Sequence, residues 1–276
     1  MKDLLHLSNI NRDDVFDIFA IADDIRQGKY RNAFAGKTAV MFFPESSIRT
    51  RVTFEKGIYL LGGQTVLFPP EALDKKEDIC DVAGYLSNWA DVVIVRHKDM
   101  QLLECMAEYS AVPVINAMTD TEHPCEILSD LYALSQIRKD ITADKYLFVG
   151  ADGNIGRTWK EAAALMGFDL LHCCPDKYKM DGVAHCELLS AAAAGVDVIC
   201  TDSIPAAKLA DFSGYQVTSD IMAAANDGAV LNPCPPFFRG EEVSAEVIDS
   251  GYFVGYGFKK YLLQIQQAVL LWALSS

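Results

Sequence analysis

The chain has 276 residues, of which 51% are hydrophobic, so we expect a sizeable core divided between two compact lobes. Its formal net charge of −14 makes nucleic acid and acidic membrane surfaces unfavourable partners. No apolar run is long enough to span a bilayer, and the start of the chain carries no apolar signal region. The eight cysteines form no C-x-x-C pair or regular frame, so we expect a reduced, cytoplasmic protein.

Helix and strand patterns alternate along the first half of the chain. A helix is expected from Asn11 to Gln27, with Asn11 as its N-cap and Gly28 at its end. The next expected elements are a strand at 39–43, a helix that ends at 62–63, a strand at 64–68, a loop at 69–77, a helix at 78–89, a strand at 92–95, a helix at 100–109, a strand at 112–115 and a helix at about 125–138.

The second half repeats the alternation after a polar stretch at 139–144, where we expect the lobe boundary. Its expected elements are a strand at 145–149, a helix at 155–166, a strand at 169–173, a helix at 188–194, strands at 196–200 and 229–231, and a terminal helix at 258–274. The predicted fold class is therefore α/β, with two lobes that are each a parallel sheet flanked by helices. Ligands of such sheets bind beyond the carboxyl ends of the strands, so the active site is expected in the cleft between the lobes.

Residues 47–51 are the most informative segment because they place Ser47, Arg49, Thr50 and Arg51 where a strand passes into a helix. The free N–H groups and the dipole of a helix N-terminus favour an anion, and arginine matches the geometry of phosphate oxygens. A capped helix start with solvated arginines is the alternative, and a lone S-x-R would support it. Four such side chains in one helical turn favour a phosphate site.

Other polar side chains follow other predicted strands. Arg96 leaves an apolar strand and is a candidate anion ligand, although a surface cap explains Arg96 alone equally well and is the favoured role of His97. His123 precedes Pro124 at a helix start and is expected to point into the same crevice. Lys75 and Lys76, taken alone, form a solvated cluster.

The strand-to-helix turn at 149–156 allows two interpretations. It resembles a dinucleotide-binding turn, but Ala151 stands at the first glycine position and Asp152 would place negative charge near the pyrophosphate. Asp176 lies at the distance of a ribose-binding acid, so an NAD site stays an alternative. Arg157, in the first helical turn, could hold a carboxylate instead.

Two further strand ends carry candidate acceptor residues. Asp202 could hold an ammonium group or cap the next segment. The segment 232–236 (Asn-Pro-Cys-Pro-Pro) predicts an irregular loop, with cis geometry possible at Cys234–Pro235. The sequence shows no metal-ligand spacing and no Ser or Cys with a base close by, so we expect neither a metal nor a cofactor.

Together these residues resemble the aspartate and ornithine carbamoyltransferase family over nearly the whole chain. Residues 47–51 match that family's S-T-R-T-R phosphate motif except at Ile48, and residues 123–126 are similar to its H-P-x-Q motif. Residues 197–202 resemble the ornithine-type signature and residues 215–218 its sequel. Residues 232–235 stand in the place of H-C-L-P or H-P-L-P.

The resemblance implies transfer of the carbamoyl group of carbamoyl phosphate to an amino-acid amine. It implies a carbamoyl phosphate-binding domain (1–139), an acceptor domain (140–257) and a C-terminal helix (258–276) that packs back on the first domain. It also implies a homotrimer with shared active sites, to which Lys75 or Lys76 is donated by a neighbouring subunit. The implied carbamoyl phosphate ligands are Ser47, Ile48, Arg49, Thr50, Lys76, Arg96, His123 and Glu126, with Thr50, Arg96 and His123 polarising the carbonyl. The implied acceptor ligands are Asn154, Arg157, Asp202, Cys234 and Pro235.

Departures from the family pattern bear on the acceptor. Ile48 removes a hydroxyl from the phosphate turn, Glu126 replaces a glutamine, and Asn232 replaces a histidine. Asp202 stands where aspartate enzymes use arginine, so it would repel a second carboxylate and attract an ammonium group. We therefore expect ornithine or a shorter diamino acid as the acceptor. The alternatives are aspartate as the acceptor, a non-catalytic paralogue that binds phosphate compounds, and an NAD-dependent oxidoreductase.

Overall fold

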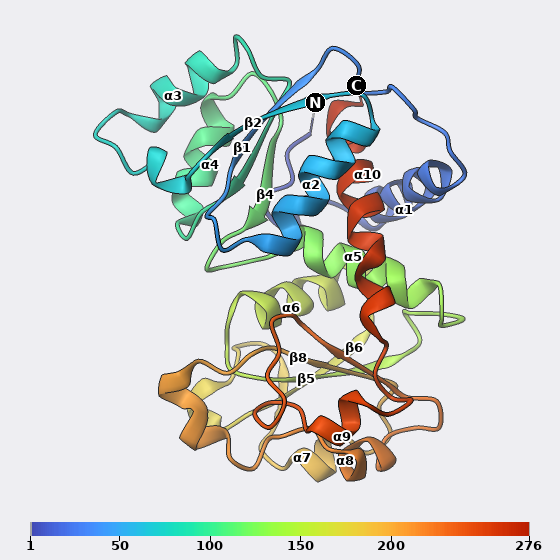
Figure 1. Ribbon diagram of the computed structural model, residues 1–276. Coiled ribbons are helices and arrows are strands. Elements are labelled where there is room, and N and C mark those ends of the chain that lie inside the picture. Colours follow the sequence, from blue (N-terminus) through green and yellow to red (C-terminus); the bar gives the residue numbers. More distant parts are fainter. Residues whose placement is uncertain (1, 276) are drawn as a thin grey trace. The chain divides into compact units, whose positions relative to one another are not determined.

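The computed structural model describes residues 2–275 (Figure 1). The chain divides into two compact units, unit 1 formed by Met1–Ala133 with Lys259–Ser276 and unit 2 formed by Leu134–Phe258. Both units are parallel sheets flanked by helices, which confirms the predicted fold class. In the described part of the chain, every helix is too short or too polar to cross a membrane.

Unit 1 is built on a parallel sheet with the strand order β2-β1-β3-β4. Its strands are β1 (Thr38–Phe42), β2 (Gln64–Phe68), β3 (Val92–Arg96) and β4 (Val114–Met118). Its helices are α1 (Arg12–Arg26), α2 (Ile48–Leu60), α3 (Ile79–Leu86), α4 (Met100–Tyr109) and α10 (Leu262–Leu274), and α5 (Pro124–Ser135) runs from unit 1 into unit 2.

Local signals explain why the first helix forms where the sequence predicts it. Asn11 accepts a hydrogen bond from Asp14 N, and the Asp14 side chain accepts from Asn11 N, so two N–H groups at the helix start are satisfied. Gly28 follows the helix with a φ of 85°, a conformation that favours glycine.

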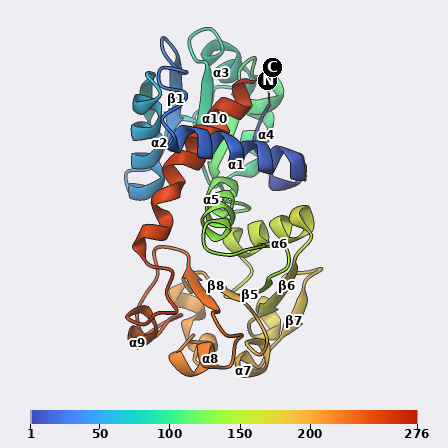
Figure 2. The ribbon, with the colours of Figure 1, turned by 90° about the vertical axis from the view of Figure 1, so that its right-hand side faces the viewer.

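Helix α10 joins unit 1 from the far end of the sequence and packs against α1 and α2 (Figure 2). Gln267 Nε2 donates to Gly57 O at 2.9 Å, and Trp272 Nε1 donates to Asp14 Oδ1 at 3.0 Å. A Cβ atom on Gly57 would lie only 3.0 Å from Gln267 Cγ, so glycine permits the close approach of the two helices. The C-terminal segment is thus part of the unit that holds the N-terminus.

Unit 2 contains a parallel sheet with the strand order β7-β6-β5-β8-β9. Its strands are β5 (Lys145–Val149), β6 (Asp169–Cys173), β7 (Ala184–Cys186), β8 (Val198–Thr201) and β9 (Val230–Pro233). Its helices are α6 (Asn154–Met166), α7 (Leu189–Ala192), α8 (Ser219–Ala223) and α9 (Ala245–Ile248).

Several predicted boundaries are wrong, each for a local reason. Strand β4 starts at Val114 because Pro113, which has no N–H, precedes it. The terminal α-helix starts at Leu262, because Tyr256–Tyr261 forms a 3-10 helix. The cis peptide bond joins Pro235 and Pro236, one residue beyond the predicted bond.

Candidate active site

In unit 1, the segments that leave β1, β3 and β4 meet at one edge of the sheet, because these strands are parallel neighbours. Ser47 is the N-cap of α2 and is buried, and Arg96 is the last residue of β3. Arg96 Nη1 donates to Ser47 Oγ at 2.9 Å. Two residues that are 49 positions apart in the sequence thus share one polar site.

The first turn of α2 carries most of the candidate phosphate ligands. The Ser47 side chain makes no cap hydrogen bond to the helix, so its hydroxyl does not occupy the first N–H groups of α2. Thr50 is buried on the first turn, whereas Ile48 and Arg49 are exposed, Ile48 by 69%. The Ile48 side chain faces outward, and its backbone N–H donates to Ser46 O at 2.9 Å, a bond that a phosphate at this turn would replace.

His123 lies just before α5 and is buried. Burial lowers the pKa of its imidazole to about 4, the Arg96 and Lys259 cations add to this, and the charge of Glu126 opposes it. At neutral pH the ring is therefore uncharged, and it can still donate one N–H to a carbonyl oxygen.

Glu126 is held by a lysine from the C-terminal segment. Lys259 Nζ lies 2.7 Å from Glu126 Oε1 and 2.5 Å from Asp130 Oδ1. Burial raises the pKa of Glu126, but the charge and hydrogen bond of Lys259, with His123 and Arg49, outweigh it and hold the pKa below its usual value. Glu126 is therefore a carboxylate whose charge is offset.

Lys259 is a residue of the candidate site that was not predicted from the sequence. A signal was present: Glu126 and Asp130 are one helical turn apart on a segment in which every residue is buried, and buried carboxylates require a counter-ion. The sequence did not indicate which lysine supplies it.

A cavity of about 340 Å³ opens beside Arg96 in unit 1. His97 lines it, receives a hydrogen bond from Asp99 N at 3.1 Å and bonds Asp74 Oδ1 at 3.1 Å. The prediction of His97 as a surface cap is wrong, because His97 is buried and Asp99 is the N-cap of α4. Lys76 lies two residues beyond Asp74 in the loop after β2 and is exposed. The complete lining is Pro44, Pro70, Glu71, Asp74, Arg96, His97, Lys98, Met118 and Asp120.

In unit 2, the candidate acceptor residues follow β5, β8 and β9, which are adjacent in the sheet. Asn154 and Arg157 lie in the first turn of α6, and Asp202 follows β8. A Cβ atom on Gly150 would lie 3.7 Å from Asp202 N, so the turn before α6 runs close to the residues after β8. Cys234, after β9, donates its N–H to Thr201 O at 2.9 Å.

The polar groups of these residues already have partners within unit 2. Arg157 donates two hydrogen bonds to Asp152, from Nε to Oδ1 at 2.7 Å and from Nη2 to Oδ2 at 2.9 Å. Asn154 Oδ1 accepts from Ile155 N, and Asp202 Oδ1 accepts from Ser203 N, both at 2.9 Å. Asp152 thus reduces the positive charge that Arg157 can offer to a carboxylate.

The residues behind the dinucleotide interpretation have structural roles. A Cβ atom on Gly156 would lie 2.6 Å from the Phe148 ring, so this glycine lets α6 pack on β5. Asp176 is exposed and forms an ion pair with Lys179 at 2.7 Å. Over residues 2–275, His, Cys, Asp and Glu side chains form no group of three that could hold a metal ion.

Two models of the aspartate/ornithine carbamoyltransferase family match the chain, the carbamoyl-P binding domain over residues 2–136 and the Asp/Orn binding domain over residues 143–273. The chain belongs to this family. Among carbamoyltransferases, the ornithine carbamoyltransferase of Methanobrevibacter smithii is 35% identical, with 98% of each chain covered, and that of Desulfotalea psychrophila is 31% identical, with 97% of each covered. The ornithine carbamoyltransferase structure from Thermus thermophilus superposes with a TM-score of 0.93 at 26% identity, covering 100% of this chain and 99% of that one. The family predicted from the sequence is confirmed.

Proposed function

We propose that this protein transfers the carbamoyl group of carbamoyl phosphate to the amine of ornithine or a shorter diamino acid and releases phosphate. The observation that carries the proposal is the meeting of Ser47 and Arg96 at the start of α2, with His123 at the same edge of the sheet. Relatives at least 30% identical to this chain include several named ornithine carbamoyltransferases, which supports the acceptor class.

In the proposed complex, the phosphate group lies at the positive end of α2. It is bound by Ser47, Arg49, Thr50, Arg96 and the backbone N–H of Ile48. Thr50, Arg96 and the neutral imidazole of His123 bind the carbonyl oxygen. Glu126 accepts a hydrogen bond from the carbamoyl NH₂ group, and Lys76 contributes a cation.

The reaction needs no covalent intermediate. The neutral amine attacks the carbonyl carbon, a C–N bond forms, and the C–O bond to phosphate breaks. The leaving phosphate accepts the proton that the amine loses. Negative charge grows on the carbonyl oxygen during the attack, and one preorganised donor to such an oxygen stabilises the transition state by about 3 kcal/mol.

The acceptor residues proposed in unit 2 are Asn154, Arg157, Asp202, Cys234 and Pro235. Arg157 binds the carboxylate of the amino acid, and Asp202 binds its second ammonium group. The negative charge of Asp202 disfavours a dicarboxylate such as aspartate, because like charges at short range repel.

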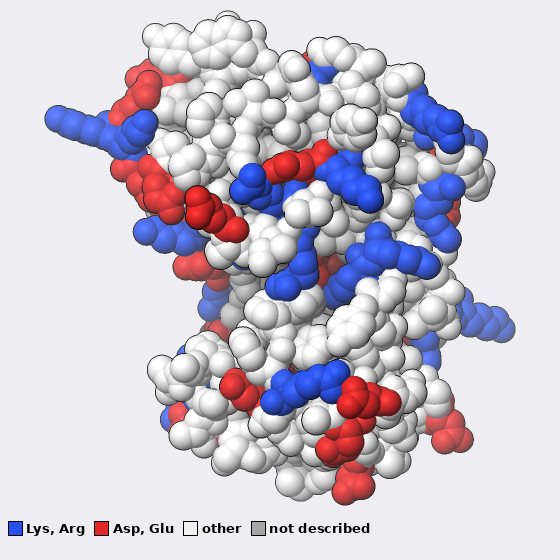
Figure 3. All heavy atoms as spheres, in the orientation of Figure 1, with Lys and Arg blue, Asp and Glu red and all other residues white. Residues whose placement is uncertain are grey.

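We also propose a cytoplasmic homotrimer in which Lys76 enters the site of a neighbouring subunit. All eight cysteines are free thiols, as expected in a reducing compartment. Large apolar side chains are exposed on α2 and on the edge strand β2, namely Ile48, Val52, Tyr59, Val66 and Phe68. Figure 3 shows broad areas without charged side chains on the face of unit 1 that it presents. Such surfaces are typical of subunit interfaces.

The test is release of phosphate from carbamoyl phosphate, with the carbamoylated product identified by mass spectrometry. Ornithine, 2,4-diaminobutyrate and aspartate serve as acceptors. We expect amine-dependent release with the diamino acids and a loss of about 10²–10³-fold in kcat for Arg96→Ala. Lys145→Ala, an exposed change at the start of β5, is the control. Release that no amine stimulates would refute the proposed transfer, and a preference for aspartate would refute the acceptor assignment.

A further inference from the structure

A tight turn connects β4 to the buried His123. Thr119 N donates to Glu122 O at 2.8 Å, and Glu122 N donates to Thr119 Oγ1 at 3.1 Å, so the turn is closed upon itself. Glu122 is the residue directly before His123, and His123 O accepts the first helical hydrogen bonds of α5. The backbone at Glu122 therefore determines where the His123 ring lies.

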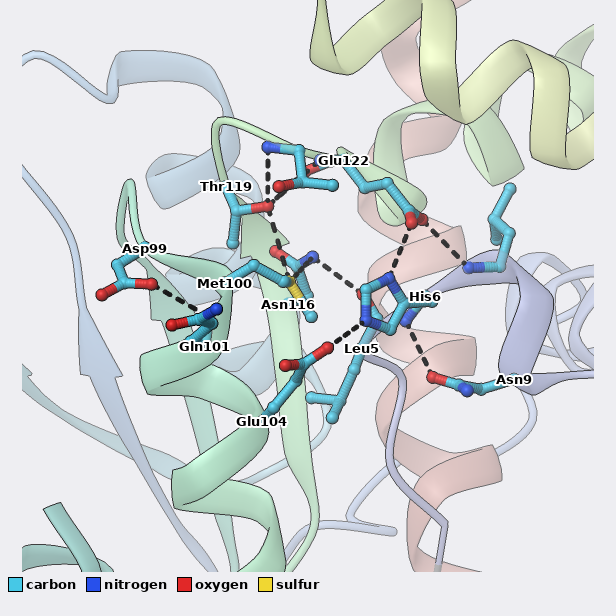
Figure 4. Close-up of polar contacts among 12 residues, drawn as sticks. Leu5, His6, Asn9, Asp99, Met100, Gln101, Glu104, Asn116, Thr119 and Glu122 are labelled. Atoms are coloured by element: carbon cyan, nitrogen blue, oxygen red, sulfur yellow. Dashed lines mark hydrogen bonds and ion pairs between the residues drawn. The ribbon is translucent and has the colours of Figure 1, made fainter. Parts of the chain in front are cut away.

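The buried Glu122 side chain is held by the N-terminal segment of the chain (Figure 4). His6 Nδ1 donates to Glu122 Oε1 at 2.7 Å, and Leu7 N donates to Glu122 Oε2 at 3.2 Å. The same segment is fixed to β4, because Asn116 Nδ2 donates to Leu5 O at 2.8 Å. Both carboxylate oxygens of Glu122 are thus occupied by residues more than a hundred positions away.

His6 bridges two carboxylates. Its Nε2 atom bonds Glu104 Oε1 on α4 at 3.0 Å, while Nδ1 bonds Glu122 (Figure 4). A neutral imidazole carries one N–H, so both bonds can be made as donated bonds only by the protonated ring. Burial lowers the pKa of His6, but the hydrogen bonds and charges of Glu122 and Glu104 outweigh it, so the pKa is raised. The contact with Glu122 is therefore a charged pair that weakens as pH rises.

We propose that His6 and Glu122 are positioning residues for His123. Their ion pair fixes the turn that presents the imidazole to the carbonyl oxygen of carbamoyl phosphate, and this role rests on the proposed function. Neither residue touches the substrate. Both act through the placement of His123, so their effect on kcat depends on the presence of that ring.

The experiment compares the wild type with His6→Ala, His6→Gln and Glu122→Gln in amine-dependent phosphate release between about pH 6 and pH 9. We expect each variant to lower kcat about 10-fold at the low end of the range, since small displacements of a catalytic group carry large rate penalties. The ratio of wild-type kcat to His6→Ala kcat should fall towards one as pH rises through the pKa of His6, because the wild-type pair is then lost as well. Using the ratio removes the titration of the acceptor amine, which all the proteins share.

A mutant cycle with His123→Ala separates positioning from general stability. In that background His6→Ala should leave kcat unchanged, because the ring that it places is absent. Asp14→Asn is the matched control: Asp14 is bound by Lys2 and Trp272, so the change should lower Tm without altering kcat. A pH-independent ratio, or an undiminished effect of His6→Ala in the His123→Ala background, would overturn the inference. A wild-type enzyme that transfers nothing would instead refute the proposed function itself.

Discussion

Replacing Lys259 by methionine would leave two buried carboxylates without their shared counter-ion. The Lys259 side chain is 19% exposed, whereas the side chains of Glu126 and Asp130 are 7% and 1% exposed. Removal of one partner from a buried ion pair costs about 3–5 kcal/mol, because the remaining charge stays desolvated. Methionine keeps the length of the apolar stem, so little packing is lost. We expect Lys259→Met to lower the free energy of unfolding by about 3 kcal/mol at neutral pH.

The pH dependence of this loss identifies its cause. In the wild type the pKa of Glu126 is lowered in the folded state, so its contribution is present above the unfolded pKa and is lost as pH falls through the folded pKa. Without Lys259, burial dominates and raises the folded pKa of Glu126 above the unfolded value. The destabilisation of the Lys259→Met variant therefore decreases as pH falls, since the neutral acid is easier to bury. Urea unfolding followed by circular dichroism should show a larger loss at about pH 8 than at about pH 5.

Two further variants make this prediction decisive. Glu126→Gln with Asp130→Asn, introduced into the Lys259→Met protein, removes both uncompensated charges and should restore most of the lost stability. Lys260→Met changes the exposed neighbour of Lys259 and should shift the free energy of unfolding by no more than about 0.5 kcal/mol. The reasoning fails if Lys259→Met behaves like Lys260→Met, or if its loss is equal at both pH values.

Three other outcomes follow from the structure. Gly156→Ala would place a Cβ atom 2.6 Å from the buried Phe148 ring and should destabilise unit 2 by about 1–3 kcal/mol in thermal unfolding; an unchanged Tm would contradict this packing. The Lys76→Ala and Arg96→Ala proteins are each expected to be inactive alone. When they are unfolded and refolded together, subunits that share sites in a closed oligomer should regain about a quarter of wild-type activity. No recovery would place Lys76 in its own subunit's site or outside any site. Because burial lowers the pKa of His123 to about 4, the NMR signals of its ring should show the neutral form down to about pH 5. The free energy of unfolding should fall as pH drops from about 6.5 towards 4. Titration of the ring near pH 6.5 would contradict the buried, neutral state.

The elements that the sequence located well depend on neighbours within the same segment. The N-cap Asn11, the stop at Gly28 and the apolar run of β5 are all local, and the structure has them where they were predicted. Strand β7, with only three residues, was missed because it is too short to show an alternating pattern. Its position follows from pairing with β6, which a local pattern does not record.

The candidate site shows the same contrast between features that depend on neighbouring residues and features that depend on distant ones. The candidate phosphate ligands at 47–51 were chosen because they are adjacent in the sequence, and Arg96 and His123 because each follows a predicted strand. The charged pairs that support them join distant residues: Lys259 is 133 positions from Glu126, and His6 is 116 positions from Glu122. Such pairs depend on the placement of the N-terminal segment and the C-terminal segment in unit 1, which no local pattern predicts.

The pairing of Lys259 changes the meaning of Glu126. A carboxylate in the place of the family's glutamine would oppose a dianionic ligand if its charge stood alone. Lys259 neutralises one of the two carboxylates, and Arg49, whose charge also lowers the pKa of Glu126, acts on the same group. Arg96, bound to Ser47 at the same edge, is a third cation beside these two carboxylates, while the cavity next to Arg96 is lined by the acids Glu71, Asp74 and Asp120. Glu126 is therefore compatible with carbamoyl phosphate binding, and its presence does not favour a non-catalytic paralogue over an enzyme.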